Sequence, residues 1–170
     1  MKNKKWLLFI FCLCSIFMFG CSSNDGIVRI HIRANSNAEI DQNVKLLVRD
    51  EVIGYITPLL ASCSNSNDVK NILEENLESI EKLADNVLLN NDFTYSSKAR
   101  ISNEYFPTRS YDGEVYPADY YDALILELGT GEGDNWWCVA YPPLCFVGDG
   151  VGDVKYRSKL LELINNFFGV

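Results

Sequence analysis

The stretch of residues 131–146, GEGDNWWCVAYPPLCF, constrains this chain more than any other part of its sequence. It combines a tryptophan pair, a Pro-Pro pair and two cysteines that six residues separate. Proline fixes its own φ and forces an extended conformation on the residue before it, here Tyr141, so Cys138 is expected to leave a short strand and Cys145 to return after a sharp bend. The spacing allows Cys138 to reach Cys145. We therefore predict a hairpin closed by a Cys138–Cys145 disulfide around a hydrophobic plug.

The first twenty residues have the pattern of a signal peptide. Three lysines precede an apolar run over residues 6–19, which is short for a mature transmembrane helix. Gly20 precedes Cys21, and a polar Ser/Asn run follows, as at the processing site of bacterial lipoproteins. We expect residues 1–20 to be removed and Cys21 to carry lipid; cleavage elsewhere, or retention as an anchor, are the alternatives. The protein is then exported, and residues 27–170 form a single domain.

The negative charge of the chain limits the classes of molecule that it can bind. The formal net charge is −8, and loss of the lysines in the leader makes the mature domain more acidic. Phosphate backbones and anionic lipid surfaces repel such a domain, which excludes nucleic-acid binding. A lipid anchor or a protein partner is therefore needed to hold the protein at a membrane.

Alternating side chains predict the strands. Residues 27–33 place Val28, Ile30 and Ile32 on one face, and Arg29, His31 and Arg33 on the other. On that second face we expect the arginines to be solvated and His31 to be a hydrogen-bonded structural residue, not a catalytic base. Further strands are expected at residues 93–101, 123–128 and 136–139, with the last paired to the one before it. Between them, the aromatic-rich residues 105–121 carry an Asp-Gly turn signal and are expected to fold over the sheet.

Three helices are expected between and after these strands. The first covers residues 39–55, with Ser36 and Glu39 as a capping box and Pro58 limiting its length. The second is continuous over residues 68–88, where acidic side chains including Glu81 form a solvated face. The third covers residues 154–168. The order β-α-α-β-β-β-α predicts an α+β two-layer domain with helices packed on a mostly antiparallel sheet.

The residues that could carry nucleophilic catalysis are few, whereas a catalytic pair of carboxylates stays open, because Asp and Glu are plentiful and their pairing in space is not visible in the sequence. A Cys–His or Ser–His enzyme has to use His31, the one histidine, and no GxSxG motif occurs. No Cys/His cluster has the spacing of a zinc site. We therefore expect no catalytic residues, no metal and no cofactor. The Trp136-Trp137 pair could stack on sugar rings, so the alternative is a secreted cell-wall module that binds or hydrolyses glycan or peptidoglycan.

The same tryptophans are the candidates for partner binding. Neighbouring side chains in a strand point to opposite faces, so one of Trp136 and Trp137 should enter the core and the other should meet a partner. Asn135 adjoins them, and Arg109 lies in the aromatic segment expected to fold nearby. We predict that these residues form the binding surface.

Several stretches together resemble the stage II sporulation protein R family of endospore-forming bacteria. They are, in chain order, IHIRANSN (30–37), VKLLVRDEV (44–52), FPTRSYDG (106–113), YPADYYDAL (116–124) and GEGDNWWCVAYPPLCF (131–146). The resemblance implies a signalling protein, not an enzyme. It implies export from the forespore into the space between the forespore and mother-cell membranes. There the family activates a membrane-embedded aspartic protease that processes the precursor of sporulation sigma factor E.

Overall fold

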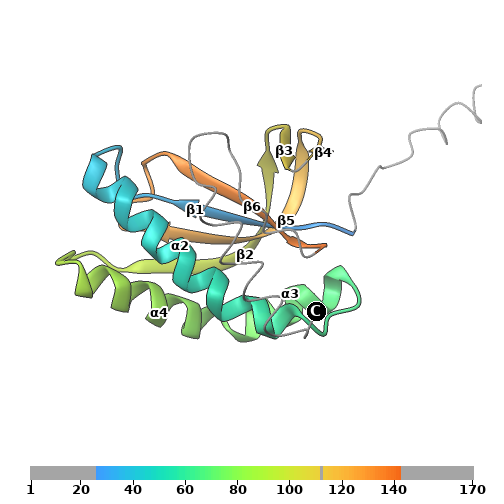
Figure 1. Ribbon diagram of the computed structural model, residues 1–170, viewed down its shortest axis with the longest axis horizontal. Coiled ribbons are helices and arrows are strands. Elements are labelled where there is room, and N and C mark those ends of the chain that lie inside the picture. Colours follow the sequence, from blue (N-terminus) through green and yellow to red (C-terminus); the bar gives the residue numbers. More distant parts are fainter. Residues whose placement is uncertain (1–25, 112, 143–170) are drawn as a thin grey trace, which may run out of the picture.

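A computed structural model describes residues 26–111 and 113–142 of the chain. Three helices cover one face of a four-stranded mixed sheet, and a short hairpin stands over the other face (Figure 1). The predicted α+β two-layer architecture is confirmed. The expected leader, Cys21, Cys145 and the expected helix at residues 154–168 lie outside the described residues.

The first strand of the chain lies inside the sheet, whose order is β2-β5-β1-β6. β1 (Val28–Arg33) pairs in parallel with β5 (Asp119–Leu128) and antiparallel with β6 (Asn135–Tyr141). β2 (Ser97–Phe106) pairs antiparallel with β5. The predicted central strand over residues 123–128 is thus confirmed within β5. The prediction that β6 pairs with β5 is wrong, because β1 lies between them.

The loop from β5 to β6 passes the end of β1. Gly133 donates its N–H to the carbonyl of Ala34 at 2.8 Å. A Cβ at position 133 would lie 2.3 Å from the carbonyl oxygen of Ser36, so only glycine fits there. This close approach lets the chain step over β1 and add β6 on its far side.

The first helix, α2 (Glu39–Leu60), runs past the expected end and contains Pro58. Proline removes the hydrogen bond to the carbonyl of Gly54, but both residues are exposed, and water can satisfy that carbonyl. On the opposite side, Ile56 and Leu60 are buried in the core. Burial of these side chains explains why the helix continues through its proline.

The capping box predicted for Ser36 and Glu39 does not form. Ala38 is the N-cap residue, without a side-chain bond, and Ser36 instead donates to Asp41 at 2.5 Å. Asp41 accepts further bonds from Asn35 at 3.0 Å and from the Tyr95 hydroxyl at 2.6 Å. Burial raises the pKa of Asp41, but these hydrogen bonds outweigh it and leave the pKa below its ordinary value. The first turn of α2 is therefore fixed by a buried carboxylate.

The predicted second helix is two helices, α3 (Ser66–Glu75) and α4 (Leu77–Asn90), separated at Asn76. The Asn76 side chain donates to the carbonyl of Ile72 at 2.7 Å and accepts from the Tyr55 hydroxyl at 2.7 Å. Asparagine competes in this way with regular helix bonds, and Tyr55 ties the break to α2. Apolar periodicity continues across the break, so the sequence pattern concealed it.

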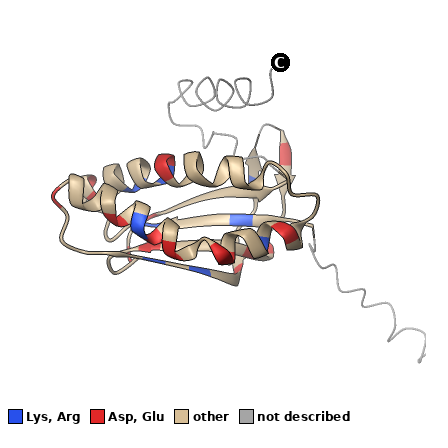
Figure 2. Cartoon of the chain, turned by 90° about the horizontal axis from the view of Figure 1, so that it is seen from below, with Lys and Arg blue, Asp and Glu red and all other residues tan. Residues whose placement is uncertain are grey.

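The hydrophobic core lies between the helices and the sheet. Val28, Ile30 and Ile32 of β1 are completely buried there, as the alternation predicted. Acidic side chains recur along the helices (Figure 2). In the described part of the chain, no helix is both long and apolar enough to span a bilayer.

The aromatic segment folds over the sheet, as expected. It forms the hairpin of β3 (Arg109–Tyr111) and β4 (Glu114–Tyr116), with Gly113 at φ +93° in the turn. Tyr111 and Tyr116 pack on Val139 of β6. The strand predicted at residues 93–101 instead begins at Ser97, and its 97–106 span leads directly into this hairpin.

Candidate functional site

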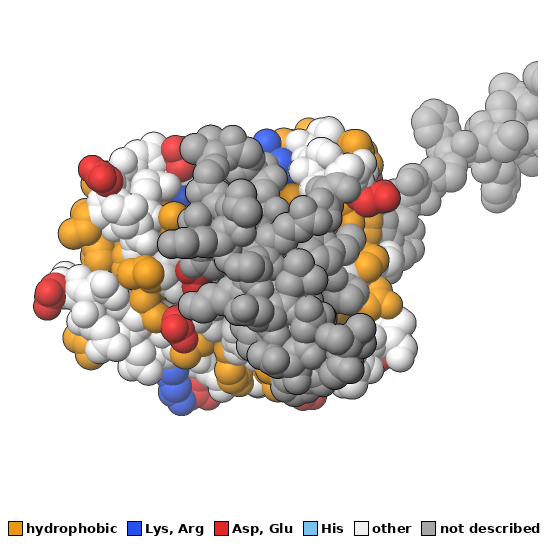
Figure 3. Space-filling model, viewed as in Figure 1, with side chains coloured by type: hydrophobic (Ala, Val, Ile, Leu, Met, Phe, Trp, Pro, Cys, Tyr) orange, Lys and Arg blue, Asp and Glu red, His pale blue; other side chains and the backbone are white. Residues whose placement is uncertain are grey.

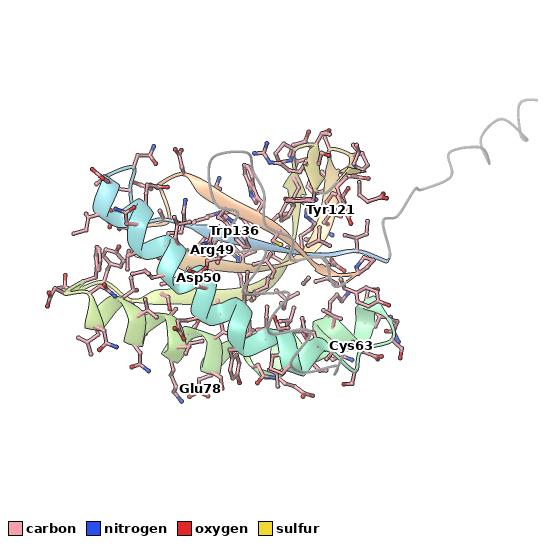
Figure 4. The ribbon with its side chains drawn as sticks, viewed as in Figure 1. Arg49, Asp50, Cys63, Glu78, Tyr121 and Trp136 are labelled. Carbon is pink, nitrogen blue, oxygen red and sulfur yellow. The ribbon has the colours of Figure 1, made fainter. Side chains whose placement is uncertain are left out.

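Strand β6 places its two tryptophans on opposite faces of the sheet, as predicted. Trp136 packs against the core on the helix side, where Arg49 of α2 lies 5.5 Å from its ring (Figure 4). Trp137 packs against the cluster of Phe106 and its neighbours on the other face. Both side chains are half-buried, so neither is a deep plug.

The hairpin brings Arg109 onto Trp137. The guanidinium carbon of Arg109 lies 4.1 Å from the centroid of the indole ring, which is a cation–π contact. Arg109 and Tyr111 are alternate residues of β3 and therefore share a face. The Tyr111 hydroxyl donates to the carbonyl of Trp137 at 3.2 Å, which fixes the hairpin over this part of β6.

Asn135 joins this surface from the end of β6. Its partner in the register is Arg33, and the partner of Trp137 is His31, so all four residues share the face of the hairpin. Asn135 is exposed, whereas Trp137 and Arg109 are half-buried. The structure thus brings Trp137, Arg109 and Asn135 together, and it places Trp136 on the opposite face.

Arg29 was expected on a solvated face, and that expectation is wrong. Its exposed fraction is 0%. Its Nε donates to the carbonyl of Cys138 at 3.2 Å, and its Nη2 donates to the Tyr111 hydroxyl at 3.0 Å. Four rings surround its guanidinium carbon at 4.7–5.6 Å, namely those of Phe106, Tyr111, Tyr116 and Tyr121. The tyrosines of the folded hairpin exclude water from a cation that the strand alone would leave exposed.

Arg33 is not freely solvated either. It donates to Glu104 and to Glu127, each at 2.6 Å. Arg100 forms ion pairs with the same two carboxylates at 2.8 Å and 2.9 Å. These four side chains make a network on the hairpin face beside His31. Sequence reasoning missed it because the partners come from three strands.

His31 lies between this network and the tryptophan. Its ring centroid is 5.6 Å from those of Phe106 and Trp137, and its exposed fraction is 5%. Burial lowers the pKa of His31, and the charge of Arg33 lowers it further, against the raising effects of Asn135 and Glu104. Glu104 Oε2 is 3.4 Å from Nδ1, in a geometry that makes no hydrogen bond. The imidazole is therefore neutral near pH 7.

Four buried nitrogen atoms around Trp137 have no hydrogen-bond partner among residues 26–111 and 113–142. They are Arg29 Nη1, Arg109 Nε and both ring nitrogens of His31. Buried polar atoms are usually bonded, so their concentration on one face distinguishes this surface from the rest of the described domain. We therefore take the hairpin face around Trp137 as the candidate binding site.

The arrangement does not favour nucleophilic catalysis. Cys63 and Cys138 both pack on the helix side of the sheet, whereas His31 faces the hairpin. Neither cysteine can therefore form a thiolate–imidazole pair with it. Among residues 26–111 and 113–142, no cluster of His, Cys, Asp and Glu could hold a metal ion.

The cysteine predictions depend on residues beyond the described part. Cys138 is buried, with its side chain in the core on the helix side. Cys145 and Cys21 lie outside the described residues, so the disulfide and the lipidation stay predictions.

The family model and the curated relative that match this chain carry the same description. The model of the family described as stage II sporulation protein R matches residues 24–150. The stage II sporulation protein R of Bacillus subtilis (strain 168) is 33% identical over 135 residues, which are 79% of this chain and 60% of the relative. The chain thus spans about three-fifths of the length of that curated relative. No solved structure matches.

Proposed function

Because this chain belongs to the stage II sporulation protein R family of sporulation proteins, we propose that it acts as an exported signal between the two cells of the sporangium. Its target is a membrane-embedded aspartic protease, which then processes the precursor of sporulation sigma factor E. The protein acts by binding this protease, not by turnover of a substrate.

The observation that carries the proposal is the contact of Arg109 with Trp137. Tryptophan and arginine dominate the energetics of protein interfaces, because they offer a large area or planar donors at a modest cost in entropy. Here both are half-buried and already held in place, and the exposed Asn135 lies beside them. A pre-arranged surface of this kind loses little conformational freedom on binding.

The chemistry on this face also supports a binding role. His31 is buried and enclosed by two aromatic rings, with its pKa lowered, so it is poorly placed to exchange protons with a substrate. Both Glu104 and Glu127 are engaged in ion pairs with two arginines, and hydrogen bonds and charges from these arginines outweigh burial and lower the pKa of Glu127. An acid–base pair would instead need one carboxyl group poised to hold a proton.

The proposed location follows from the N-terminal sequence. Residues 1–20 direct export, and lipid on Cys21 holds the domain at the outer face of the forespore membrane. A lipid anchor resolves how an acidic domain can work beside an anionic bilayer. Mass spectrometry of the mature N-terminus tests this directly: an unmodified N-terminus downstream of Cys21 contradicts the anchor.

Co-expression in a host without sporulation genes tests the proposed function. The full chain, the protease and the sigma-factor precursor are produced together, and the precursor is followed by immunoblot. We expect cleavage only when all three are present. A protease variant without its catalytic aspartates is the control for cleavage by host enzymes. Absence of cleavage, with all three proteins present and folded, would overturn the proposal.

A cell-wall module remains the alternative, and the structure offers it little support. Sugar rings stack on open aromatic faces, but an arginine lies over each tryptophan ring, Arg49 on Trp136 and Arg109 on Trp137. Incubation of the purified domain with peptidoglycan, with released fragments and bound protein both measured, separates the two functions.

A further inference from the structure

One edge of the sheet is partly closed by side chains of a helix. β2 is an edge strand, and the first half of its outer side faces α4. Ser97 donates its backbone N–H to Asp85 at 2.6 Å, and Ala99 donates its N–H to Glu81 at 2.7 Å. Glu81 is therefore not simply part of a solvated face, as the helical pattern suggested. These carboxylates take the place that a neighbouring strand would otherwise have.

The second half of the same edge is open. In an antiparallel strand, every second residue points its backbone N–H and C=O groups away from the paired strand. Ser97 and Ala99 use their N–H groups in this outward direction, so the odd-numbered residues of β2 are the outward ones. Ser96 is an even-numbered residue, and its carbonyl accepts the N–H of Gly129 on the inner side at 2.9 Å. This bond agrees with the assignment of odd-numbered residues to the outer side. Ile101, Asn103 and Tyr105 are thus the next outward residues. Within the described residues, no group bonds their outward N–H and C=O groups.

Exposed aromatic side chains adjoin this open edge. Tyr105 and its cross-strand partner Tyr120 have exposed fractions of 59% and 63%, and their ring centroids are 5.7 Å apart. Asn103 is also exposed. The other large exposed apolar side chains lie on the helices (Figure 3), except Val115 in the short strand β4 of the hairpin.

At the opposite edge of the sheet, which β6 forms, side chains of the hairpin and of α2 bond to backbone carbonyls. On β6, the carbonyl of Trp137 accepts from the Tyr111 hydroxyl at 3.2 Å. The carbonyl of Asp134, just before the strand, accepts from Lys45 at 2.8 Å. The hairpin and α2 therefore occupy positions along β6 that a further strand would need. Residues 101–105 of β2 are the better site for strand addition.

We propose that residues 101–105 receive an extended segment of the partner protein as an added strand beside β2. Main-chain hydrogen bonds supply the affinity in this mode, and side chains at alternate positions supply the selectivity. One or two apolar side chains of the segment would pack on Tyr105 and Tyr120. The segment is neutral or basic, because the chain carries a net charge of −8. The same charge disfavours a second copy at this edge.

The partner is the protease of the proposed function, on which this inference rests. The test compares Asn103→Pro with Asn103→Ala in the co-expression assay of precursor cleavage. Proline removes the outward N–H, and edge strands tolerate it where that group faces solvent. Both variants lose the side-chain bond to Asp122 of 3.0 Å, so the proline variant differs from the alanine variant by the missing backbone donor and by its fixed φ, which suits an extended strand. Melting temperatures of both purified variants establish that each is folded.

We expect the alanine variant to cleave like the wild type, and the proline variant to need about tenfold more protein for equal cleavage. Equal cleavage by both variants overturns the added strand and leaves the proposed function intact. Loss of cleavage in both points to the side chain of Asn103 and also overturns it. If wild type itself fails, the proposed function fails, and the inference with it.

Hydrogen exchange of the wild type decides the case if the proline variant does not fold. The detergent-solubilised protease is added to the purified domain, and exchange of the three outward amides is measured. Slower exchange at Ile101, Asn103 and Tyr105 supports the added strand, and unchanged exchange overturns it. Slowing that depends on the concentration of the isolated domain identifies a second copy as the occupant, which contradicts the proposed partner.

Discussion

The guanidinium of Arg109 covers one face of the Trp137 ring at 4.1 Å, although the two residues belong to different sheets. Arg109 comes from the hairpin and Trp137 from β6, so the contact couples the position of the hairpin to that of the indole. Binding at this surface should therefore depend on the residues that hold the hairpin, as well as on the two that meet the partner.

Two substitutions of Arg109 distinguish the effect of its charge from that of its planar hydrogen-bond donors. Arg109→Ala should reduce precursor cleavage several-fold, while unfolding free energy falls by only about 0.5–1 kcal/mol, as expected for a half-exposed cation–π contact. Arg109→Lys keeps the charge but loses the planar donors, so we expect it to restore stability and only part of the cleavage. Urea unfolding and the co-expression assay measure the two effects. Full activity of Arg109→Ala would place the binding surface elsewhere.

Alanine substitutions of the two neighbouring tryptophans compare a role in stability with a role in binding. Trp136→Ala opens the core on the helix side and should lower the unfolding free energy by about 2 kcal/mol, below the usual loss for tryptophan because the ring is half-exposed. Trp137→Ala should leave the domain folded but abolish cleavage of the precursor. Thermal unfolding and the cleavage assay are applied to both. Two unfolded variants, or two fully active ones, would contradict a binding role for Trp137.

Arg29 is expected to be a stability residue. Arg29→Ala leaves a cavity among four rings and removes the donors to Cys138 and Tyr111, so we expect a loss of about 3–5 kcal/mol. Arg29→Met keeps most of the volume without a buried charge and should cost clearly less. Urea unfolding compares them. If the methionine variant were the less stable one, the cation itself would be the main source of stabilisation.

The pH dependence of stability should report on His31. Its pKa is lowered in the folded state from 6.5, so the unfolded chain binds the proton more readily. The contribution of His31 is fully present above pH 6.5 and is lost as pH falls toward the lower folded value. The slope is at most about 1.4 kcal/mol per pH unit. His31→Phe should flatten it in urea unfolding series. Asp41, whose pKa is lowered from 3.8, acts at more acidic pH, so an unchanged slope in the variant would exclude His31.

The Cys138–Cys145 bridge can be tested by thiol titration of the exported domain after unfolding without a reductant, because Cys138 is buried in the folded state. A closed loop of this length stabilises by about 2.5 kcal/mol in the chain-entropy model, so loss of either cysteine should lower the melting temperature by several degrees. Cys63→Ala is the matched control, because it removes a thiol without touching the loop. Reactivity of all three thiols in the unfolded, unreduced protein would rule out the bridge.

Local patterns predicted the strands and the faces of β1 and β6 well. Alternation is a property of neighbours in the chain, so Ile30 and Ile32 could be assigned to the core, and the tryptophans to opposite faces. The break at Asn76 was hidden for the same reason. At the break the Asn76 side chain bonds the carbonyl of Ile72 and is held by Tyr55 of another helix, and no local pattern contains the second contact.

The environment of Arg29 could not be predicted by such reasoning. An arginine in an alternating strand normally indicates a solvated position. Here the ring of Tyr121 reaches it from the neighbouring strand β5, and the rings of Tyr111 and Tyr116 reach it only after the hairpin folds back. The signal available in the sequence was the unusual number of aromatic residues around that hairpin. It indicated a covering segment without indicating what it covers.

The inner position of β1 has a consequence for how the protein is made. Its neighbours, β5 and β6, are the last described strands of the chain, so the sheet cannot be completed while ribosomes are still producing residues before 141. Contacts between distant segments also form slowly, because a long loop has to close first. Strands β1, β2 and β5 can pair once residue 128 has been made, and β6 joins them only after residue 141. Export, as proposed above, would thread the polypeptide across a membrane before it folds, and this strand order keeps the sheet incomplete until β6 has been made.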